Sequence, residues 1–443
     1  MWRKFQDLTI ISSTGLWPDD IESSQKNEWI KQNQHICMRP FDTLSTELSV
    51  TPGTSTAELL IRCCCNIIPS DDITFEEVKS DIRKGIKNVR CQKCYTSEEQ
   101  IGSSERTVGL NSTAPGLINH FLTTGIGGGY EFRIKFSNLC NLACRTCAPE
   151  FSSKYAQAHN AIVVQELQND ISENSTAWNT LCAQIKNKCA EDTEVSIAIL
   201  GGESFIQPGA VKLINWLEAN NLSKQITLRL TTNFTNLNDK IVARFEQFKL
   251  INLCASIDSV GINYNYIRWP GKFSTIQENL SVMLSKLSST LLLSITPVWS
   301  LNNIFYIVDY LDWWHNWFTR HNITTVPISN VSMCWPPEMT IQYLPEVYRS
   351  NLLSIVTVAY NHKIFNNPAH AAFKEYLNEL IIFLSDTDTI VDNQQVMFNT
   401  FLTNTYAHDI VNQIPMKLGN EKFYNILTPK HKAYFENLKV DNS

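Results

Sequence analysis

The stretch Cys140-Asn141-Leu142-Ala143-Cys144-Arg145-Thr146-Cys147 places three cysteines in a C-x3-C-x2-C pattern directly after a strand-like run. Three thiolates at this spacing can bind three irons of a four-iron–four-sulfur cluster, which leaves the fourth iron open to a substrate or cofactor. With 13 Cys in 443 residues, chance produces this spacing in about one chain in a hundred of this composition. The alternatives are three unrelated core thiols or a zinc site, although zinc usually takes four protein ligands.

The sequence around the triplet predicts a sheet of parallel strands. Short runs rich in Ile, Leu, Val or Thr alternate with helical patterns, and the expected strands are 131–136, 195–200, 226–231, 251–256, 291–298 and 324–329. Six strand–helix units predict an α/β fold with right-handed crossovers, curled into a partial (β/α)6 TIM-like barrel. Ligands gather at the carboxyl ends of such strands, and the triplet follows the first of them.

The composition narrows the class of protein. Hydrophobic residues make up 43% and charged residues 18%, and the net charge of −6 gives no support for nucleic-acid binding. No run approaches the roughly 18 apolar residues of a membrane span, and the N-terminus lacks a signal-peptide core. We therefore expect a cytoplasmic chain without nucleic-acid or membrane partners. In that reducing compartment its cysteines would serve metal sites and not disulfides.

The triplet and the later Ile199-Leu200-Gly201-Gly202-Glu203 together resemble the radical S-adenosylmethionine (radical SAM) superfamily, over about residues 130–335. The resemblance implies that Cys140, Cys144 and Cys147 hold a [4Fe–4S] cluster and act in catalysis. The open iron would then chelate S-adenosylmethionine (SAM). Many members carry an aromatic residue just before the third cysteine, where this chain has Thr146.

The same resemblance implies a set of residues that contact SAM. Two adjacent glycines would let the backbone approach the cofactor without a Cβ in the way. An arginine guanidinium would clamp the SAM carboxylate through two hydrogen bonds, with a surface ion pair as the alternative. The expected cofactor-binding residues are Gly201, Gly202, Glu203, Asn233, Ser256, Asp258 and Arg268.

A second group of cysteines precedes the triplet. Cys37, the run Cys63-Cys64-Cys65 and the pair Cys91-Gln92-Lys93-Cys94 can supply four ligands, which zinc or an iron–sulfur cluster would accept. The pattern resembles the twitch domain, and its position resembles the N-terminal twitch domain-containing radical SAM proteins of the SPASM/twitch group. The resemblance implies an auxiliary [4Fe–4S] cluster. Its metal ligands would be Cys37, Cys64, Cys91 and Cys94, with Cys63 and Cys65 open as alternatives to Cys64.

These patterns divide the chain into three expected parts. Residues 1–115 would form the twitch-like domain and 116–335 the partial barrel, while 336–443 would form a mostly helical region that could recruit substrate. The family cleaves SAM reductively to a 5′-deoxyadenosyl radical, which abstracts a substrate hydrogen atom. This implies an oxidoreductase that needs an external one-electron reductant of flavodoxin or ferredoxin type.

The substrate class is less constrained. Members with auxiliary clusters commonly modify ribosomally made peptides by cross-linking, oxidation or epimerisation, so we expect a peptide substrate. A dehydrogenase or epimerase of a sugar or small molecule is the alternative, as is a non-catalytic iron–sulfur or zinc protein. Cys334 would suit a hydrogen donor in an epimerase, although core packing is its ordinary role. The sequence leaves the bond formed, the fate of SAM and the oligomeric state open.

Overall fold

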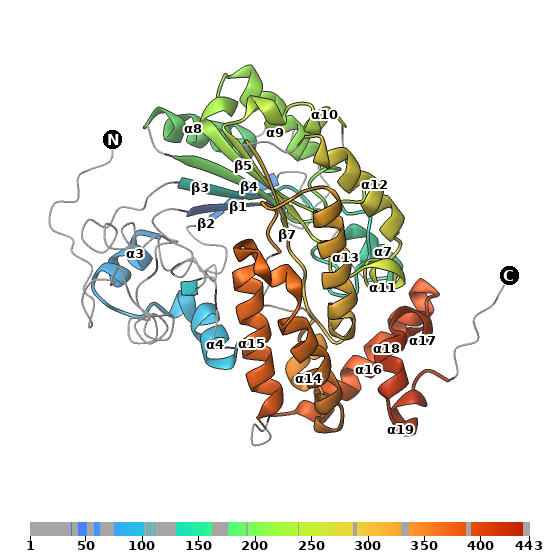
Figure 1. Ribbon diagram of the computed structural model, residues 1–443. Coiled ribbons are helices and arrows are strands. Elements are labelled where there is room, and N and C mark those ends of the chain that lie inside the picture. Colours follow the sequence, from blue (N-terminus) through green and yellow to red (C-terminus); the bar gives the residue numbers. More distant parts are fainter. Residues whose placement is uncertain are drawn as a thin grey trace. The chain divides into compact units, whose positions relative to one another are not determined.

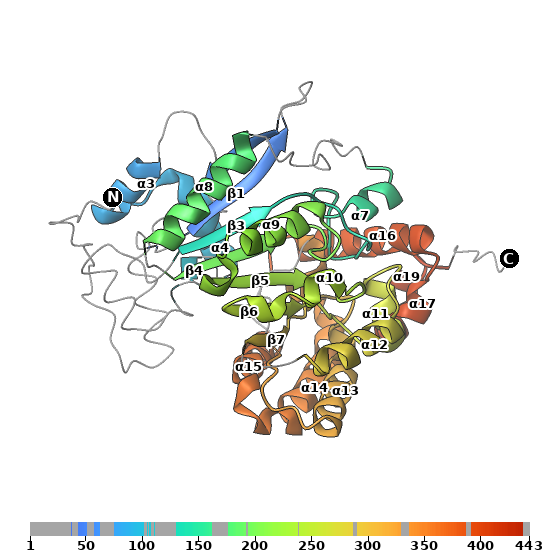
Figure 2. The same ribbon diagram turned by 90° about the horizontal axis from the view of Figure 1, so that it is seen from above.

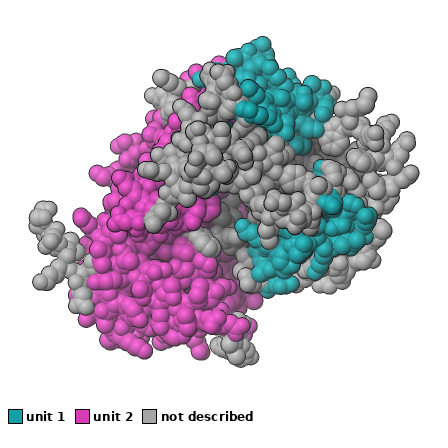
Figure 3. All heavy atoms as spheres, turned by 180° about the vertical axis from the view of Figure 1, so that it is seen from behind, with its two compact units in different colours: residues 1–136, 169–200, 215–228 teal, residues 137–168, 201–214, 229–443 magenta. Residues whose placement is uncertain are grey.

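The computed structural model describes residues 37, 43–50, 57–62, 75–101, 104, 106–107, 110, 130–161, 176–191, 194–237, 239–286, 290–328, 336–386 and 391–436. Cys63, Cys64, Cys65 and Cys334 lie outside these residues. The chain divides into two compact units (Figure 3). Unit 1 comprises Met1–Phe136, Asn169–Leu200 and Asn215–Leu228, and unit 2 comprises Ser137–Gln168, Gly201–Ile214 and Arg229–Ser443.

The strands follow the order β2-β1-β3-β4-β5-β6-β7 in one sheet (Figure 1). From β3 onward the order in the sheet is the order in the chain, as expected when parallel strands alternate with helices. The prediction of a parallel α/β sheet is therefore confirmed for five strands: β3 (Tyr130–Lys135), β4 (Val195–Leu200), β5 (Ile226–Thr232), β6 (Leu250–Ala255) and β7 (Leu291–Ile295).

In unit 1, β3 pairs in parallel with β4, from Tyr130 opposite Val195 to Lys135 opposite Leu200. β1 (Thr43–Val50) pairs in parallel with β3 and antiparallel with β2 (Ala57–Arg62). This unit also contains the helices α3 (Phe75–Arg83), α4 (Gln92–Ile101) and α8 (Thr176–Ala190). The boundaries predicted at 115 and 335 stay predictions.

In unit 2, β6 pairs in parallel with β7, and the residues of β7 alternate between buried and partly exposed positions. α11 (Gly261–Ile267) lies against α12 (Phe273–Leu284), as Figure 2 shows. The expected sixth strand at 324–329 is wrong: in the described residues it shrinks to one parallel bridge between Ile295 and Ile328. Pro327 explains this, because a proline has no N–H to donate to a ladder. Its carbonyl still accepts from the backbone of Ile295.

Helices follow the sheet in unit 2. α13 (Ile307–Arg320), α14 (Glu346–Tyr360) and α15 (Ala371–Ser385) pack in sequence (Figure 1). The chain then forms α16 (Gln394–Asn412), α17 (Met416–Gly419), α18 (Glu421–Ile426) and α19 (Pro429–Lys432), with α17 against α11. Every helix in the described part of the chain is too short or too polar to cross a bilayer.

Candidate active site

The cysteine loop, residues 140–147, lies wholly within unit 2 and has no regular secondary structure. Side chains that follow the loop satisfy its backbone. Ser152 Oγ donates to the carbonyl of Leu142 at 2.5 Å, and Ser153 Oγ accepts from the backbone of Cys140 at 3.1 Å. Buried backbone groups without such partners would destabilise an irregular loop, so the two serines help to fix its path.

The segment after α11 holds the opposite side of the cysteine loop. The backbone N–H groups of Ala143 and Arg145 donate to the carbonyls of Trp269 and Ile267 at 2.7 and 2.8 Å. Arg268 lies between these two acceptors in the chain. The loop and the expected carboxylate clamp are therefore joined by backbone hydrogen bonds on both sides of Arg268.

The three thiols of the loop lie close enough to influence one another. Burial raises the pKa of Cys140, raises that of Cys144 well above its ordinary value, and raises that of Cys147 to about 11. Repulsion from Cys147 and Cys140 raises the pKa of Cys144 further. Because iron binds the thiolate, loading this site would release protons. Three neighbouring soft donors suit an iron–sulfur cluster.

Gly202 packs directly against the cysteine loop. Its φ is 48°, and a Cβ built there would stand 2.2 Å from the carbonyl oxygen of Leu139. The backbone N–H of Glu203 donates to the same oxygen at 2.8 Å. We expected this glycine to let the backbone approach SAM. In the structure, the space that a side chain of Gly202 would take is occupied by the backbone of Leu139, the residue before Cys140.

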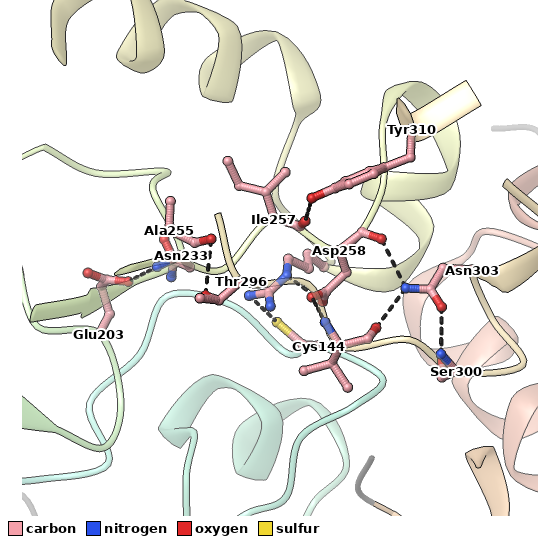
Figure 4. A network of polar contacts seen from close by, with 12 residues as sticks. Cys144, Glu203, Asn233, Ala255, Ile257, Asp258, Thr296, Ser300, Asn303 and Tyr310 are labelled. Carbon is pink, nitrogen blue, oxygen red and sulfur yellow. Dashed lines mark hydrogen bonds and ion pairs between the residues drawn. The ribbon is translucent and has the colours of Figure 1, made fainter. Parts of the chain in front are cut away.

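The Glu203 carboxylate connects this turn to the end of β5. It is 1% exposed and accepts from the backbone of Phe205 at 3.1 Å and of Asn233 at 2.6 Å. Asn233 lies beside Glu203 in Figure 4. Its side chain donates to Asn141 at 2.8 Å and lies 3.9 Å from Cys140 Sγ. Glu203 and Asn233 thus support the cysteine loop, and their contact with SAM stays a prediction.

Glu203 also predicts a pH dependence of stability. Burial raises its pKa from 4.5 to about 7, so the folded chain keeps a proton that the unfolded chain releases between these values. This contribution is complete below pH 4.5 and is lost as pH rises through 7, a difference of about 3 kcal/mol. In the metal-free protein, urea unfolding at pH 4.5 and pH 8 should show that loss for the wild type but not for Glu203→Gln. Equal pH dependence of the two proteins would contradict it.

Arg268 and Asp258 form a buried ion pair beside Cys144. The Arg268 Nε donates to Asp258 Oδ2 at 2.7 Å, and a terminal nitrogen of the guanidinium lies 3.9 Å from Cys144 Sγ. Asp258 is fully buried, and its other oxygen accepts from the backbone of Val298 at 2.9 Å. Asp258 therefore orients Arg268 toward the loop. Ser256 lies two residues earlier, and its backbone donates to the carbonyl of Thr232 at 2.8 Å.

Three of the four expected auxiliary ligands lie in one neighbourhood of unit 1. Burial, with added repulsion from Cys94, raises the pKa of Cys91 to about 11. Burial likewise raises the pKa of Tyr95, with added repulsion from Cys91 and Cys37. Cys64 is outside the described residues. Within the described ranges no three His, Cys, Asp or Glu side chains, those of the triplet included, converge on a single metal ion, whereas a four-iron cluster takes each thiolate on a separate iron.

No family model and no curated protein matches the chain. The chain is similar to anSMEcpe with bound AdoMet. That match has 17% identity and a TM-score of 0.37, and it covers 54% of this chain and 62% of the other.

A second similar structure is Streptococcus suis SuiB bound to S-adenosylmethionine. It has 17% identity and a TM-score of 0.34, with 64% of this chain and 59% of the other covered. The structure of SuiB bound to precursor peptide SuiA has 16% identity to this chain and a TM-score of 0.33. That match covers 64% of this chain and 59% of the other. The chain thus spans about three-fifths of the length of these structures. Similarity at this level carries no functional inference, which comes from the site itself.

Sequence reasoning missed Asn303, which helps to build the site. Asn303 donates to the carbonyls of Asp258 and Val298 at 2.9 and 2.8 Å, and accepts from the backbone of Ser300 at 2.7 Å. In Figure 4 Asp258 lies between Cys144 and Asn303. Asn303 therefore holds the backbone of Asp258 in place. A lone asparagine before a helix carries no sequence signal for this role, because Asp258 lies 45 positions earlier in the chain.

Proposed function

We propose that the chain is a radical SAM enzyme in which Cys140, Cys144 and Cys147 hold the SAM-binding [4Fe–4S] cluster. The observation that carries the proposal is the arrangement around Cys144. This buried thiol stands beside two other thiols and 3.9 Å from a guanidinium that a buried aspartate orients. The bound cluster would supply the electron that cleaves SAM to methionine and a 5′-deoxyadenosyl radical.

The residues of the chain would bind and orient the cofactor. Asp258 occupies the Nε of Arg268 and one terminal nitrogen faces Cys144 Sγ. The remaining N–H groups of the guanidinium would bind the SAM carboxylate. Gly201, Gly202, Glu203, Asn233 and Ser256 would line the same side of the site, partly by holding the cysteine loop in shape. Burial of the ion pair excludes water from Cys144 and strengthens the electrostatic contact.

The finer assignment rests on the sequence patterns. The parallel sheet would belong to a partial TIM-like barrel. Residues 1–115 would form an N-terminal twitch-like domain with an auxiliary [4Fe–4S] cluster, and residues 336–443 a substrate-recruiting region. The substrate would be a ribosomally made peptide, and a flavodoxin- or ferredoxin-type protein in the cytoplasm would supply electrons. The auxiliary cluster would accept the electron left after oxidation or cross-linking.

The direct test is cleavage of SAM under reducing, anaerobic conditions. The protein is loaded with iron and sulfide, reduced with dithionite and mixed with SAM. Formation of 5′-deoxyadenosine and methionine, measured by liquid chromatography and mass spectrometry, would support the enzyme. Intact SAM beside a fully loaded and reduced cluster would contradict it and favour a non-catalytic iron–sulfur protein.

Iron stoichiometry tests the auxiliary site separately. Two four-iron clusters predict about eight irons per chain, and a single cluster about four. Cys91→Ser should lower the iron count by about four, because it removes one expected ligand of the auxiliary cluster. Cys91 and Cys37 both lie near Tyr95. Cys189→Ser, at a partly exposed position on α8, is the matched control and should leave the count unchanged. A wild-type count near four with one bound zinc would show that the N-terminal cysteines hold zinc.

A further inference from the structure

A second buried ion pair adjoins the cysteine loop. Arg145, which follows Cys144 in the chain, donates through a terminal nitrogen to Asp409 Oδ1 at 2.6 Å. Neither side chain is exposed to solvent. Asp409 belongs to α16, and the two residues are 264 positions apart. The pair therefore ties the C-terminal region to the loop that carries the three cysteines.

The Arg145 guanidinium is held on its other sides as well. Its Nε donates to the carbonyl of Tyr266 at 2.9 Å, and its remaining terminal nitrogen donates to the carbonyl of Thr405 at 3.2 Å. Its central carbon lies 3.6 Å from the centroid of the Tyr266 ring. The planar fork of arginine suits this combination of stacking and several hydrogen bonds, which a lysine cannot reproduce.

Asp409 is fixed as firmly as its partner. Its second oxygen accepts from the backbone of Met416, the first residue of α17, at 2.6 Å. Because α17 packs against α11, the carboxylate joins α16, α17 and the segment that carries Tyr266. A charge in so dry a place persists only when an opposite charge compensates it.

Two arginine–aspartate pairs thus connect to the cysteine loop, one through Arg268 beside Cys144 and the other through Arg145, which belongs to the loop itself. Arg268 is neutralised by Asp258, and Arg145 by Asp409. An uncompensated buried cation next to the cluster would favour the more negative, reduced state, because Coulomb energies are large in a low dielectric. Neutralising both arginines keeps the cluster hard to reduce while preserving the hydrogen bonds that shape the loop.

We propose that Asp409 is a positioning residue that, through Arg145, holds the cysteine loop and keeps the reduction potential of its cluster low. The C-terminal region would then help to build the radical-generating centre, in addition to any role toward substrate. This inference rests on the proposed function, since it concerns the cluster bound by Cys140, Cys144 and Cys147.

The test compares the cluster's reduction potential in three anaerobically loaded proteins, by redox titration followed with electron paramagnetic resonance. Asp409→Asn leaves Arg145 uncompensated and should shift the potential to more positive values. The double variant Arg145→Gln/Asp409→Asn has no buried charge at this position and should return toward the wild-type value. Asp312→Asn removes a carboxylate that is 59% exposed and contacts His362 on the surface, and should change nothing.

This pattern separates a charge effect from simple damage to the fold. A merely structural pair would give impaired loading in the single and double variants alike, with no reversal of the potential, and that result would overturn the proposal. If Asp409→Asn alone fails to load, thiol labelling of the metal-free proteins decides. Cys140, Cys144 and Cys147 should then react faster in Asp409→Asn than in wild type or Asp312→Asn, and equal rates would overturn the proposal. A wild type that binds no cluster would instead refute the proposed function.

Discussion

Replacement of Cys144 by serine should remove about four irons per chain and abolish SAM cleavage. Cys144 is the buried thiol of the triplet, whereas Cys140 and Cys147 are partly exposed, and it stands beside the Arg268 guanidinium. A serine hydroxyl ionises far less readily than a thiol and is a harder donor, so it does not replace a thiolate on iron. The measurements are iron and sulfide content after anaerobic loading, and 5′-deoxyadenosine formed with dithionite.

The substitution is small enough to leave the fold intact, and a matched control makes the result specific. Cys189→Ser makes the same chemical change at a partly exposed position on α8, and it should load and react as wild type does. Far-ultraviolet circular dichroism should show the same helix content in all three proteins. Undiminished 5′-deoxyadenosine formation by Cys144→Ser would contradict the assignment of the triplet to the radical-generating cluster.

The strands were predictable because their apolar residues recur with a simple pattern. The strand expected at 195–200 has the same bounds as β4. The bounds of the strand expected at 131–136 differ from those of β3 by one residue at each end. The last expected strand was wrong because hydrophobicity alone ignores the missing N–H of Pro327. β1 reaches β3 from a segment more than eighty residues earlier, and local periodicity does not specify such pairing.

The features of the candidate site likewise fall into those that local sequence reveals and those that depend on long-range packing. Ligand spacing is local, so the triplet could be recognised from the sequence, and Asp258 and Arg268 are only ten positions apart. The supporting contacts are not local. Arg145 meets Asp409 across 264 positions, and Asn263 donates to Gly419 across 156. A sequence reader sees an arginine between two cysteines, but its buried partner depends on how α16 packs.

The two glycines of the turn before Glu203 illustrate a different limit. A pair of glycines indicates a backbone position that excludes side chains, without saying what occupies the space. The family resemblance suggested SAM. For Gly202 the structure assigns that space to Leu139, which directly precedes the cysteine loop. Gly202 can still serve the cofactor indirectly, because it makes room for the backbone that leads into the cysteine loop, and this loop carries the cluster ligands.

Gly202→Ala should therefore disable the site through the loop. The substitution places a Cβ 2.2 Å from the carbonyl oxygen of Leu139 and puts alanine at a φ of 48°. Left-handed backbone costs a non-glycine residue about 1–2 kcal/mol, and a backbone–backbone clash must be relieved by moving the loop. We expect the free energy of unfolding to fall by about 3 kcal/mol or more, with little iron bound after loading.

Gly261→Ala separates the cost of the left-handed backbone from the cost of the clash with Leu139. Gly261 has a similar φ of 57°, but a Cβ there meets nothing within 4 Å. It should lose only the backbone term of about 1–2 kcal/mol and should load iron as wild type does. Urea unfolding of the metal-free proteins and iron analysis of the loaded ones give both quantities. Equal losses of stability and normal loading in both variants would mean that the turn tolerates a side chain. The contact between Gly202 and Leu139 would then not be what fixes the cysteine loop.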